Sequence, residues 1–402
     1  MTYDFDTIVD RRGTGNEKWD GMEARYGVSP AEGLALWVAD MEFLPPPEVN
    51  EAIRTAAQHG IHGYWGDPGP YLDAVAGWMR RRHGWEVRPE WIFTTHGIVN
   101  AVSLAVQAFC RPGDKVVVQP PVYYPFFGAI TANGCEVVNN ELVRVDGLYR
   151  MDLGALDRMV DASTRMLILC SPHNPGGRVW SRAELEDLAG FCLSRDILIL
   201  SDEIHHDLVY EGHTHTVLAT LDPDIAGRVV TCTSASKTFN LAGTMTGNVI
   251  IPDEGLRRRY QLQMTKCGLY APNRFGPLAA KAAYDHGEPW LEQLLVYLRA
   301  NRDLVDREAR DKLPGVTSMP LQGTYLAWLD FRETGLPAEE VVRRVQAEAK
   351  LALNHGATFG QGGEGHMRLN FACPRGMLRE ALSRLTRVFG AEGSEMAGGR
   401  GS

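Results

Sequence analysis

The stretch MLILCSPHNPGGRVWSRAELEDLAGFCLSRDILILSD, residues 166–202, decides the fold class. It begins and ends with short apolar runs, 166–171 and 197–202, which have the length of buried β-strands. Between them, a turn rich in Gly and Pro precedes a helical pattern that begins with a capping box, Ser181 and Glu184. Two apolar strands joined through a helix predict parallel neighbours in a sheet that is covered on both faces.

The same alternation continues on both sides of this stretch. Further apolar runs that predict strands lie at 91–95, 115–119, 229–236 and 248–252. The predicted fold class is therefore α/β, with a mostly parallel sheet in a large domain. From about residue 289 the pattern changes to a long amphipathic helix, two separated strands and a last helix at 376–389, which predicts a smaller α+β domain.

These changes of pattern predict four segments. Residues 1–48 form an N-terminal segment that contributes to the small domain and the active site, and 49–288 form the large domain. Residues 289–390 form the small C-terminal domain. The tail 391–402 has no apolar periodicity and is predicted to be disordered.

Composition excludes several classes of protein. The 402 residues include 41 basic and 50 acidic side chains, a balance that argues against binding to nucleic acid or an anionic membrane. Seven cysteines without a C-x-x-C pair favour reduced thiols over a disulfide scaffold. The N-terminus lacks the layout of a signal peptide, and no apolar run reaches the length of a membrane helix. We therefore expect a cytoplasmic protein without nucleic-acid or membrane partners.

Reactive side chains gather where the predicted strands end. These residues are His96–Val99, Tyr123–Tyr124, Asn174, Asp202 and Lys237. Any one of them alone would be an ordinary loop residue. Because ligands of open α/β sheets bind beyond the carboxyl ends of the strands, the whole set indicates a site.

The chemistry that this set suggests is that of pyridoxal 5′-phosphate (PLP). Lys237 can form a Schiff base with the cofactor's aldehyde, and Asp202 can keep the pyridine nitrogen protonated so that the ring accepts electrons. Asn174 can donate to the phenolate oxygen, and Tyr123 can stack on the ring.

Two further groups complete the predicted site. The phosphate would bind at Gly97, Ile98 and Val99, which begin a helix, and Ser234 lies three residues before the lysine. Arg368, in the second unit, can hold an amino-acid carboxylate through its two-pronged guanidinium.

With these residues in place, the sequence resembles the fold-type I PLP enzymes, the aspartate aminotransferase superfamily. The blocks that carry this resemblance are SPHNPGG (171–177), SDEIHHDLVY (201–210), SASKTFNLAG (234–243) and HMRLNFACP (366–374). Finer features are similar to the cystathionine β-lyase or C–S lyase subgroup of MalY/PatB type. They are YDFDTIVDRRGTGNEKWD (3–20), LWVADMEF (36–43) and GIHGYW (60–65).

This resemblance implies a homodimer that cleaves cystathionine or a related S-substituted cysteine to a thiol, pyruvate and ammonia, with Lys237 as the base. It also implies that Tyr64 reaches the phosphate of the partner subunit's cofactor and that Ala39 lines the substrate entrance. The alternative is an aminotransferase, which shares the steps up to removal of the α proton.

The sequence departs from the wider superfamily at two positions. His205 stands where aminotransferases commonly carry a tyrosine, as in the lyase subgroup. The phosphate-binding arginine that usually follows the lysine is replaced by Leu241–Gly247, so hydroxyls such as those of Thr244 or Thr246 are expected to hold the phosphate.

Three competing interpretations were weighed. The S-x-x-K spacing of Ser234 and Lys237 also occurs in penicillin-binding enzymes, but the S-D-N and K-T-G partners are missing. A metal site is conceivable among the histidines at 205, 206, 213 and 215 with Asp202 and Asp207. Without an H-E-x-x-H motif, no metal is predicted. A regulatory role through protein contacts stays open, and turnover of cystathionine would distinguish it from an enzyme.

Overall fold

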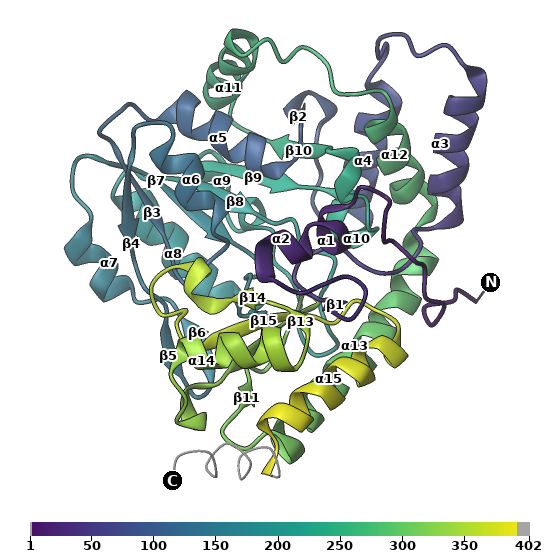
Figure 1. Ribbon diagram of the computed structural model, residues 1–402. Helices are drawn as coiled ribbons and strands as arrows, with labels where there is room; N and C mark the ends of the chain where they lie inside the picture. Colours follow the sequence, from purple (N-terminus) through teal and green to yellow (C-terminus); the bar gives the residue numbers. More distant parts are fainter. Residues whose placement is uncertain (1, 392–402) are drawn as a thin grey trace.

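A seven-stranded sheet lies at the centre of the chain, whose computed structural model describes residues 2–391 (Figure 1). The disorder predicted for the tail therefore falls outside the described residues, apart from Ala391. The strand order is β2 (Ile92–Thr95), β10 (Gly247–Ile250), β9 (Val229–Thr233), β8 (Leu198–Asp202), β7 (Thr164–Cys170), β3 (Lys115–Val118) and β4 (Glu136–Asn139). Only β10 runs antiparallel to its neighbours in this sheet. The mostly parallel sheet is confirmed.

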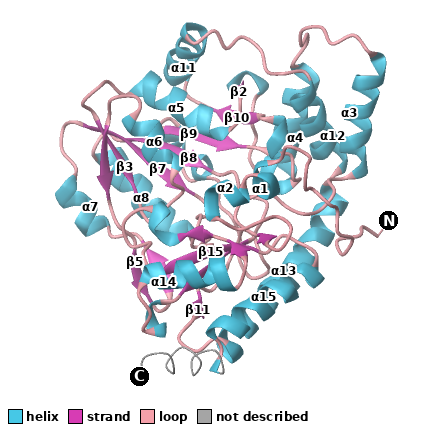
Figure 2. Cartoon of the chain, in the orientation of Figure 1, coloured by secondary structure: helices cyan, strands magenta, loops and turns pink. Residues whose placement is uncertain are grey.

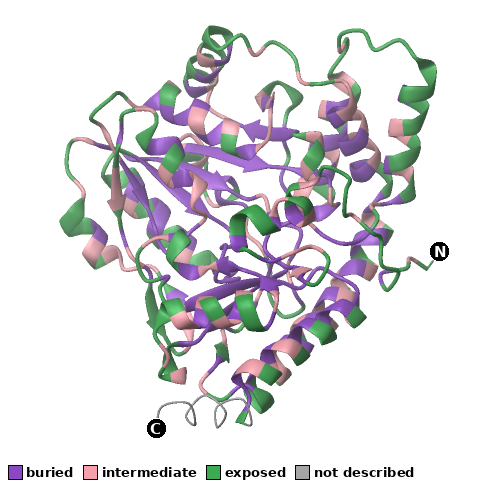
Figure 3. Cartoon of the chain, viewed as in Figure 1, coloured by how far each residue is buried: buried purple, intermediate pink, exposed green. Residues whose placement is uncertain are grey.

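The two faces of this sheet are covered by different helices, because successive strand residues point to opposite faces. Met166 and Ile168 belong to one apolar cluster, with residues of α5 (Ile98–Phe109), α6 (Pro125–Thr131) and α11 (Glu254–Lys266). The alternate residues Leu167 and Leu169 belong to another, with residues of α4 (Gly69–His83), α8 (Arg182–Ser194) and α12 (Phe275–His286). Figure 2 shows these helices on both sides of the strands, and Figure 3 shows the strands buried between them.

The structure confirms the capping box at the start of α8. Ser181 accepts a hydrogen bond from the backbone of Glu184, whose side chain accepts one from Ser181 in return. Strand β4, by contrast, was not predicted. Its two end residues are exposed and its two middle residues are half-buried at the sheet edge, so the sequence shows no long apolar run there.

A second, four-stranded sheet lies in the C-terminal part of the chain. Its order is β11 (Thr317–Ser318), β12 (Leu326–Asp330), β15 (His366–Asn370) and β14 (Asn354–His355). The flanking helices are α13 (Glu288–Lys312), α14 (Ala338–Arg343), the π-helical turn Arg344–Glu348 and α15 (Arg375–Phe389). The N-terminal segment joins this unit, since β1 (Leu34–Ala35) pairs in parallel with β13 (Leu351–Ala352).

The remaining elements are short or lie at the periphery. They are α1 (Glu17–Asp20), α2 (Met22–Tyr26), α3 (Pro47–His59), β5 (Val143–Val145), β6 (Leu148–Arg150), α7 (Leu153–Met159), α9 (Pro223–Ala226) and α10 (Ala235–Thr238), with 3₁₀ turns at Pro89–Trp91, Leu218–Thr220, Ala242–Thr244, Arg332–Thr334 and Gly356–Phe359. Among the residues described, no helix has both the length and the apolar character that crossing a membrane requires.

Candidate active site

A cavity of about 180 Å³ opens at the carboxyl ends of the parallel strands, where the sequence places the reactive side chains. Strands β7 and β8 end at Cys170 and Asp202, which both line it. The residues lining it that were also predicted for the site are Ala39, Gly97, Ile98, Val99, Tyr123, Asn174, Asp202, His205 and Lys237. The fold therefore brings most of the predicted site together.

Asp202 is a buried carboxylate whose hydrogen-bond donor is a neutral backbone amide. Its Oδ1 accepts a hydrogen bond from the N–H of Ile204 at 3.2 Å. Burial raises the pKa of this carboxyl to about 7, and the amide and the nearby Lys237 lower it only in part. A cationic N–H in the cavity would stabilise the charged form of Asp202, which is what a protonated pyridine nitrogen offers.

Lys237 lies in the short helix α10, and its amine is enclosed. Burial lowers the pKa of Lys237 to about 8, against the opposing effect of Asp40. Its Nζ donates a hydrogen bond to the carbonyl oxygen of Ala39 at 2.6 Å. An amine with a lowered pKa is a better nucleophile and a better base near neutral pH.

The Ala39 carbonyl is itself held in place by its neighbours. It accepts a second hydrogen bond, from the hydroxyl of Tyr325 at 2.9 Å. The Asn370 amide donates to the carbonyls of Val38 and Asp40, both at 2.6 Å. The N-terminal segment therefore forms a fixed wall beside the lysine.

Arg368, on β15, is a buried cation whose hydrogen-bond partners are all neutral oxygens. It donates to Asn174 Oδ1 at 2.9 Å and to the Trp37 carbonyl at 2.7 Å, and it also bonds to Asn354. Its Nε has no partner although the residue is only 3% exposed. An anionic ligand such as an amino-acid carboxylate would satisfy this guanidinium. Because Asn174 accepts from Arg368 through its oxygen, the amide nitrogen of Asn174 is left to donate elsewhere.

The first turn of α5 faces the cavity with the predicted phosphate site. Gly97 precedes the helix with φ 81° and ψ 171°, a conformation that is essentially limited to glycine. It lets the backbone N–H groups of Ile98 and Val99 open toward the cavity they line. A helix of this length suits a phosphate at its N-terminus.

The hydroxyls expected at the phosphate lie elsewhere. Thr244 and Thr246 donate to the carbonyls of Leu241 (2.8 Å) and Thr244 (3.0 Å), and they do not appear among the residues lining the cavity. Ser234 caps α10 and donates to the Thr246 carbonyl at 2.7 Å. The hydroxyl residue that lines the cavity is Ser236, which the sequence analysis missed although it lies between two predicted residues.

Two aromatic rings and one distant tyrosine complete the predicted set. Tyr123 is enclosed, and burial raises the pKa of its phenol. Burial holds the pKa of His205 well below its ordinary value, so this ring is neutral, and its Nδ1 has no hydrogen-bond partner. Tyr64 is fully exposed, at 102%, in the loop between α3 and α4, and it does not line this cavity.

Five further residues line the cavity without having been predicted. They are Cys170, Ile204, Ser236, Ala242 and Met245. His96 also lines the cavity, and it was already among the residues at the predicted strand ends. Cys170 and Ile204 each adjoin a predicted strand end, which was an available signal. Ala242 and Met245 arrive through the turn that follows the lysine, and their residue types carry no chemical signal.

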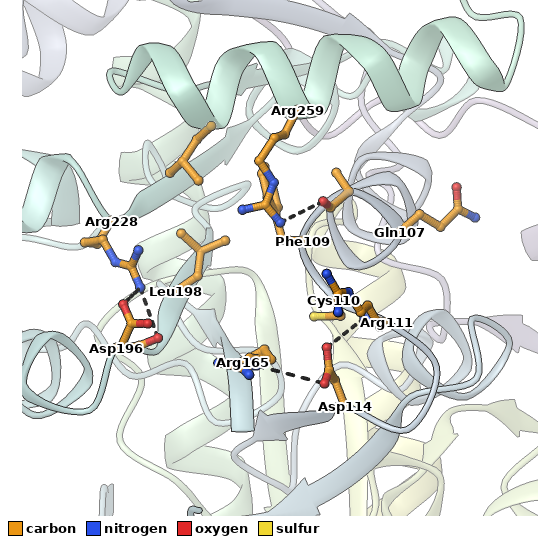
Figure 4. Close-up of a pocket in the computed structure, with 12 residues that line it drawn as sticks. Gln107, Phe109, Cys110, Arg111, Asp114, Arg165, Asp196, Leu198, Arg228 and Arg259 are labelled. Atoms are coloured by element: carbon orange, nitrogen blue, oxygen red, sulfur yellow. Dashed lines mark hydrogen bonds and ion pairs between the residues drawn. The ribbon is translucent and has the colours of Figure 1, made fainter. Parts of the chain in front are cut away.

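A wider pocket, of about 550 Å³, lies at the opposite edge of the sheet, near the amino ends of β7, β8 and β9 (Figure 4). Its arginines are partly neutralised, since Arg228 pairs with Asp196 and Arg165 pairs with Asp114. Its thiol, Cys110, has a pKa raised to about 12 by burial. The smaller cavity lies at the carboxyl ends of the strands and contains the reactive side chains, and both features favour it as the active site.

Comparison with known proteins shows the family of the chain. The sequence profile of the family described as aminotransferase class I and II matches residues 32–385. The cystathionine β-lyase PatB of Bacillus subtilis (strain 168) is 43% identical over 382 residues, which cover 95% of this chain and 98% of that protein.

Two solved structures are similar over nearly the whole chain. Cystalysin from Treponema denticola, which contains a pyridoxal 5′-phosphate cofactor, superposes with a TM-score of 0.92 at 36% identity, covering 96% of this chain and 98% of that one. The PLP-bound C–S lyase from Staphylococcus hominis gives a TM-score of 0.89 at 31% identity, covering 97% and 98%.

Proposed function

The chain belongs to the aminotransferase class I and II family, and we propose that it is a PLP-dependent carbon–sulfur β-lyase. It cleaves cystathionine or related S-substituted cysteines to a thiol, pyruvate and ammonia. The observation that carries this proposal is the enclosure of the Lys237 amine in one cavity with Asp202 and Asn174, beside a buried arginine that lacks an anionic partner. The identity to a cystathionine β-lyase over 95% of the chain favours elimination among the reactions of this family.

Each residue of the cavity has a role that follows from its surroundings. Arg368 binds the substrate carboxylate and so fixes the amino acid between the two sheets. The side-chain oxygen of Asn174 accepts a hydrogen bond from Arg368, so its amide nitrogen can donate to the cofactor ring. PLP, when bound, supplies an electron sink for the electron pair left at the substrate's Cα.

Lys237 performs the proton transfer. The free Lys237 amine would be the base that removes the proton from Cα, and burial keeps it largely neutral above pH 8. A thiolate then leaves from Cβ, which is easy because a thiolate is a weak base. The three-carbon remainder hydrolyses to pyruvate and ammonia.

We propose that the protein acts as a homodimer with shared active sites. Tyr64 supports this proposal, because its side chain is exposed at 102% and is therefore free to contact a second subunit. In the dimer it would reach the phosphate of the partner subunit's cofactor.

We also propose the domain limits 49–288 and 289–390 and a cytoplasmic location, the latter supported by seven free cysteines.

Turnover of cystathionine as the sole substrate tests this function. The lyase releases the thiol, pyruvate and ammonia continuously and in equal amounts, without an added keto acid. An aminotransferase would stop after one equivalent, leave the cofactor in its amine form and resume only when a keto acid is added. Absence of both patterns with cystathionine, cystine and S-alkyl cysteines would contradict an enzymatic role.

A further inference from the structure

Five buried metal-ligating side chains lie together behind the active-site turn, outside the cofactor cavity. The turn after β8 supplies Glu203, His206 and Asp207, the C-terminal end of α4 supplies His83, and the loop before Leu218–Thr220 supplies His215. Their side chains are exposed by no more than 6%. None of the roles proposed for the lyase reaction uses any of them.

The ligand atoms of these side chains are grouped closely enough to converge on one ion. His83 Nε2 lies 2.8 Å from Asp207 Oδ1, and His206 Nε2 lies 3.2 Å from Asp207 Oδ2. His215 Nε2 lies 2.8 Å from Glu203 Oε2. The ligand atoms fall within 4.8 Å of one another in two triplets, and His206 belongs to both.

His206 provides the independent sign that a ligand is missing. Its Nδ1 has no hydrogen-bond partner although the residue is only 2% exposed, and its Nε2 approaches only Asp207 Oδ2, at 3.2 Å. Leaving a nitrogen of a buried imidazole unsatisfied is unfavourable, whereas a metal ion accepts the lone pair of a neutral imidazole. The other members of the cluster are hydrogen-bonded, so this ring stands out at its centre.

We propose that this cluster binds one zinc ion through His83, His206 and Asp207, with the fourth ligand from the Glu203–His215 pair. Imidazole and carboxylate ligands suit zinc, whereas calcium and magnesium prefer a shell of oxygens. Two buried carboxylates balance the double charge of the ion. A carboxylate that hydrogen-bonds a ligating histidine is a common outer partner in zinc sites.

The ion would fix the turn that carries the cofactor-binding residues. Asp202 precedes Glu203 directly, and His205 precedes His206. Asp207 also accepts a hydrogen bond from Thr238, the residue after the reactive lysine, at 2.7 Å. Zinc at this place is therefore a structural element that joins α4, the β8 turn and α10, with no part in the proton transfer.

Zinc binding by the PLP-loaded enzyme tests the proposal. Untagged protein is stripped with a chelator, dialysed against zinc chloride and analysed by elemental mass spectrometry and thermal unfolding. We expect one zinc per chain and a higher Tm than that of the stripped protein, and no change with magnesium. Cobalt in place of zinc should give the visible absorption of a tetrahedral site.

Matched variants locate the site. His206→Asn and His83→Gln should each weaken zinc binding by about tenfold or more and remove the cobalt spectrum. His213→Asn, on an exposed histidine of the same loop, should bind zinc as the unchanged protein does. The cofactor's absorption band reports whether each variant is folded. Less than a tenth of an equivalent in the unchanged protein, or full binding by His206→Asn, would overturn the proposal.

Discussion

The buried amine of Lys237 is expected to react differently from the amine of an exposed lysine. Burial lowers the pKa of Lys237 to about 8, so its neutral, nucleophilic form predominates above that pH. We therefore expect the rate of PLP attachment to the cofactor-free enzyme to rise with pH, to be half-maximal near pH 8 and to level off above about pH 9. An exposed lysine, with a pKa of about 10.4, would keep gaining rate beyond pH 9.

Stopped-flow absorbance at several pH values measures this rate, and borohydride followed by peptide mass spectrometry locates the attached group. The label should lie on the peptide with Lys237. Lys237→Ala should lose the label and the turnover while still binding the cofactor without a covalent bond. A label on Lys266 or Lys281 would contradict the assignment.

Arg368 is predicted to determine substrate affinity more than turnover. Arg368→Lys keeps the positive charge but loses the planar two-point contact with a carboxylate. We expect kcat/KM to fall about 10- to 100-fold, mostly through a higher KM, because a hydrogen bond to a charged group contributes about 1.5–3 kcal/mol. Steady-state kinetics with cystathionine measures the change.

Arg387→Lys, at an exposed position of α15, is the matched control and should leave KM unchanged. If Arg368→Lys also left KM unchanged for every amino acid tested, the substrate carboxylate would have to bind elsewhere. The cofactor's absorption band should be the same in both variants, which shows that the cavity is intact.

Among elements, strands with strong apolar patterns could be predicted, whereas a half-exposed strand without such a pattern could not. Strands β7 and β8 are largely buried on both faces, so most of their residues are apolar and the sequence shows them as continuous runs. Strand β4 is half-exposed and shows no such run. The same contrast holds in the site. Lys237, Asp202 and Asn174 carry chemistry that the sequence displays, whereas Met245 lines the cavity only because of the path of a turn.

The capping box of α8 gives a prediction about stability. Ser181→Ala removes the side-chain oxygen that accepts from the backbone N–H of Glu184, so one N–H at the helix start loses its partner. We expect the free energy of unfolding to fall by about 1 kcal/mol. Urea unfolding should show a lower midpoint with the slope unchanged.

Ser194→Ala, at the exposed C-terminal end of the same helix, is the control for this change. It removes a hydroxyl of the same kind without affecting the cap, so its effect should be smaller. Equal losses in the two variants would mean that the capping box adds no specific stability.

At the scale of the whole molecule, the site depends on three distant parts of the chain. Helix α10, which follows strand β9 of the large sheet, provides Lys237, and the small sheet provides Arg368. The N-terminal segment provides the Ala39 carbonyl that the lysine contacts. The sequence could show each of these residues but not their contacts, because pairing between sheets follows from packing. A substrate that contacts both Lys237 and Arg368 should therefore restrict the movement of one sheet relative to the other.

The exposed Tyr64 extends this argument to a second subunit, and mixed dimers test it. Tyr64→Phe and Lys237→Ala each impair every site of their own homodimer. In a mixed dimer, the subunit with the intact lysine receives the intact tyrosine of its partner, if Tyr64 acts across the interface. Because half of the dimers would be mixed and one of their two sites complete, reassociation of equal amounts should restore activity to about a quarter of that of the unchanged enzyme.

Tyr270→Phe, at another exposed tyrosine, should leave activity unchanged in its own homodimer. If mixing restored nothing while size-exclusion chromatography and mass spectrometry showed mixed dimers, Tyr64 would act within its own subunit or have no role in the site.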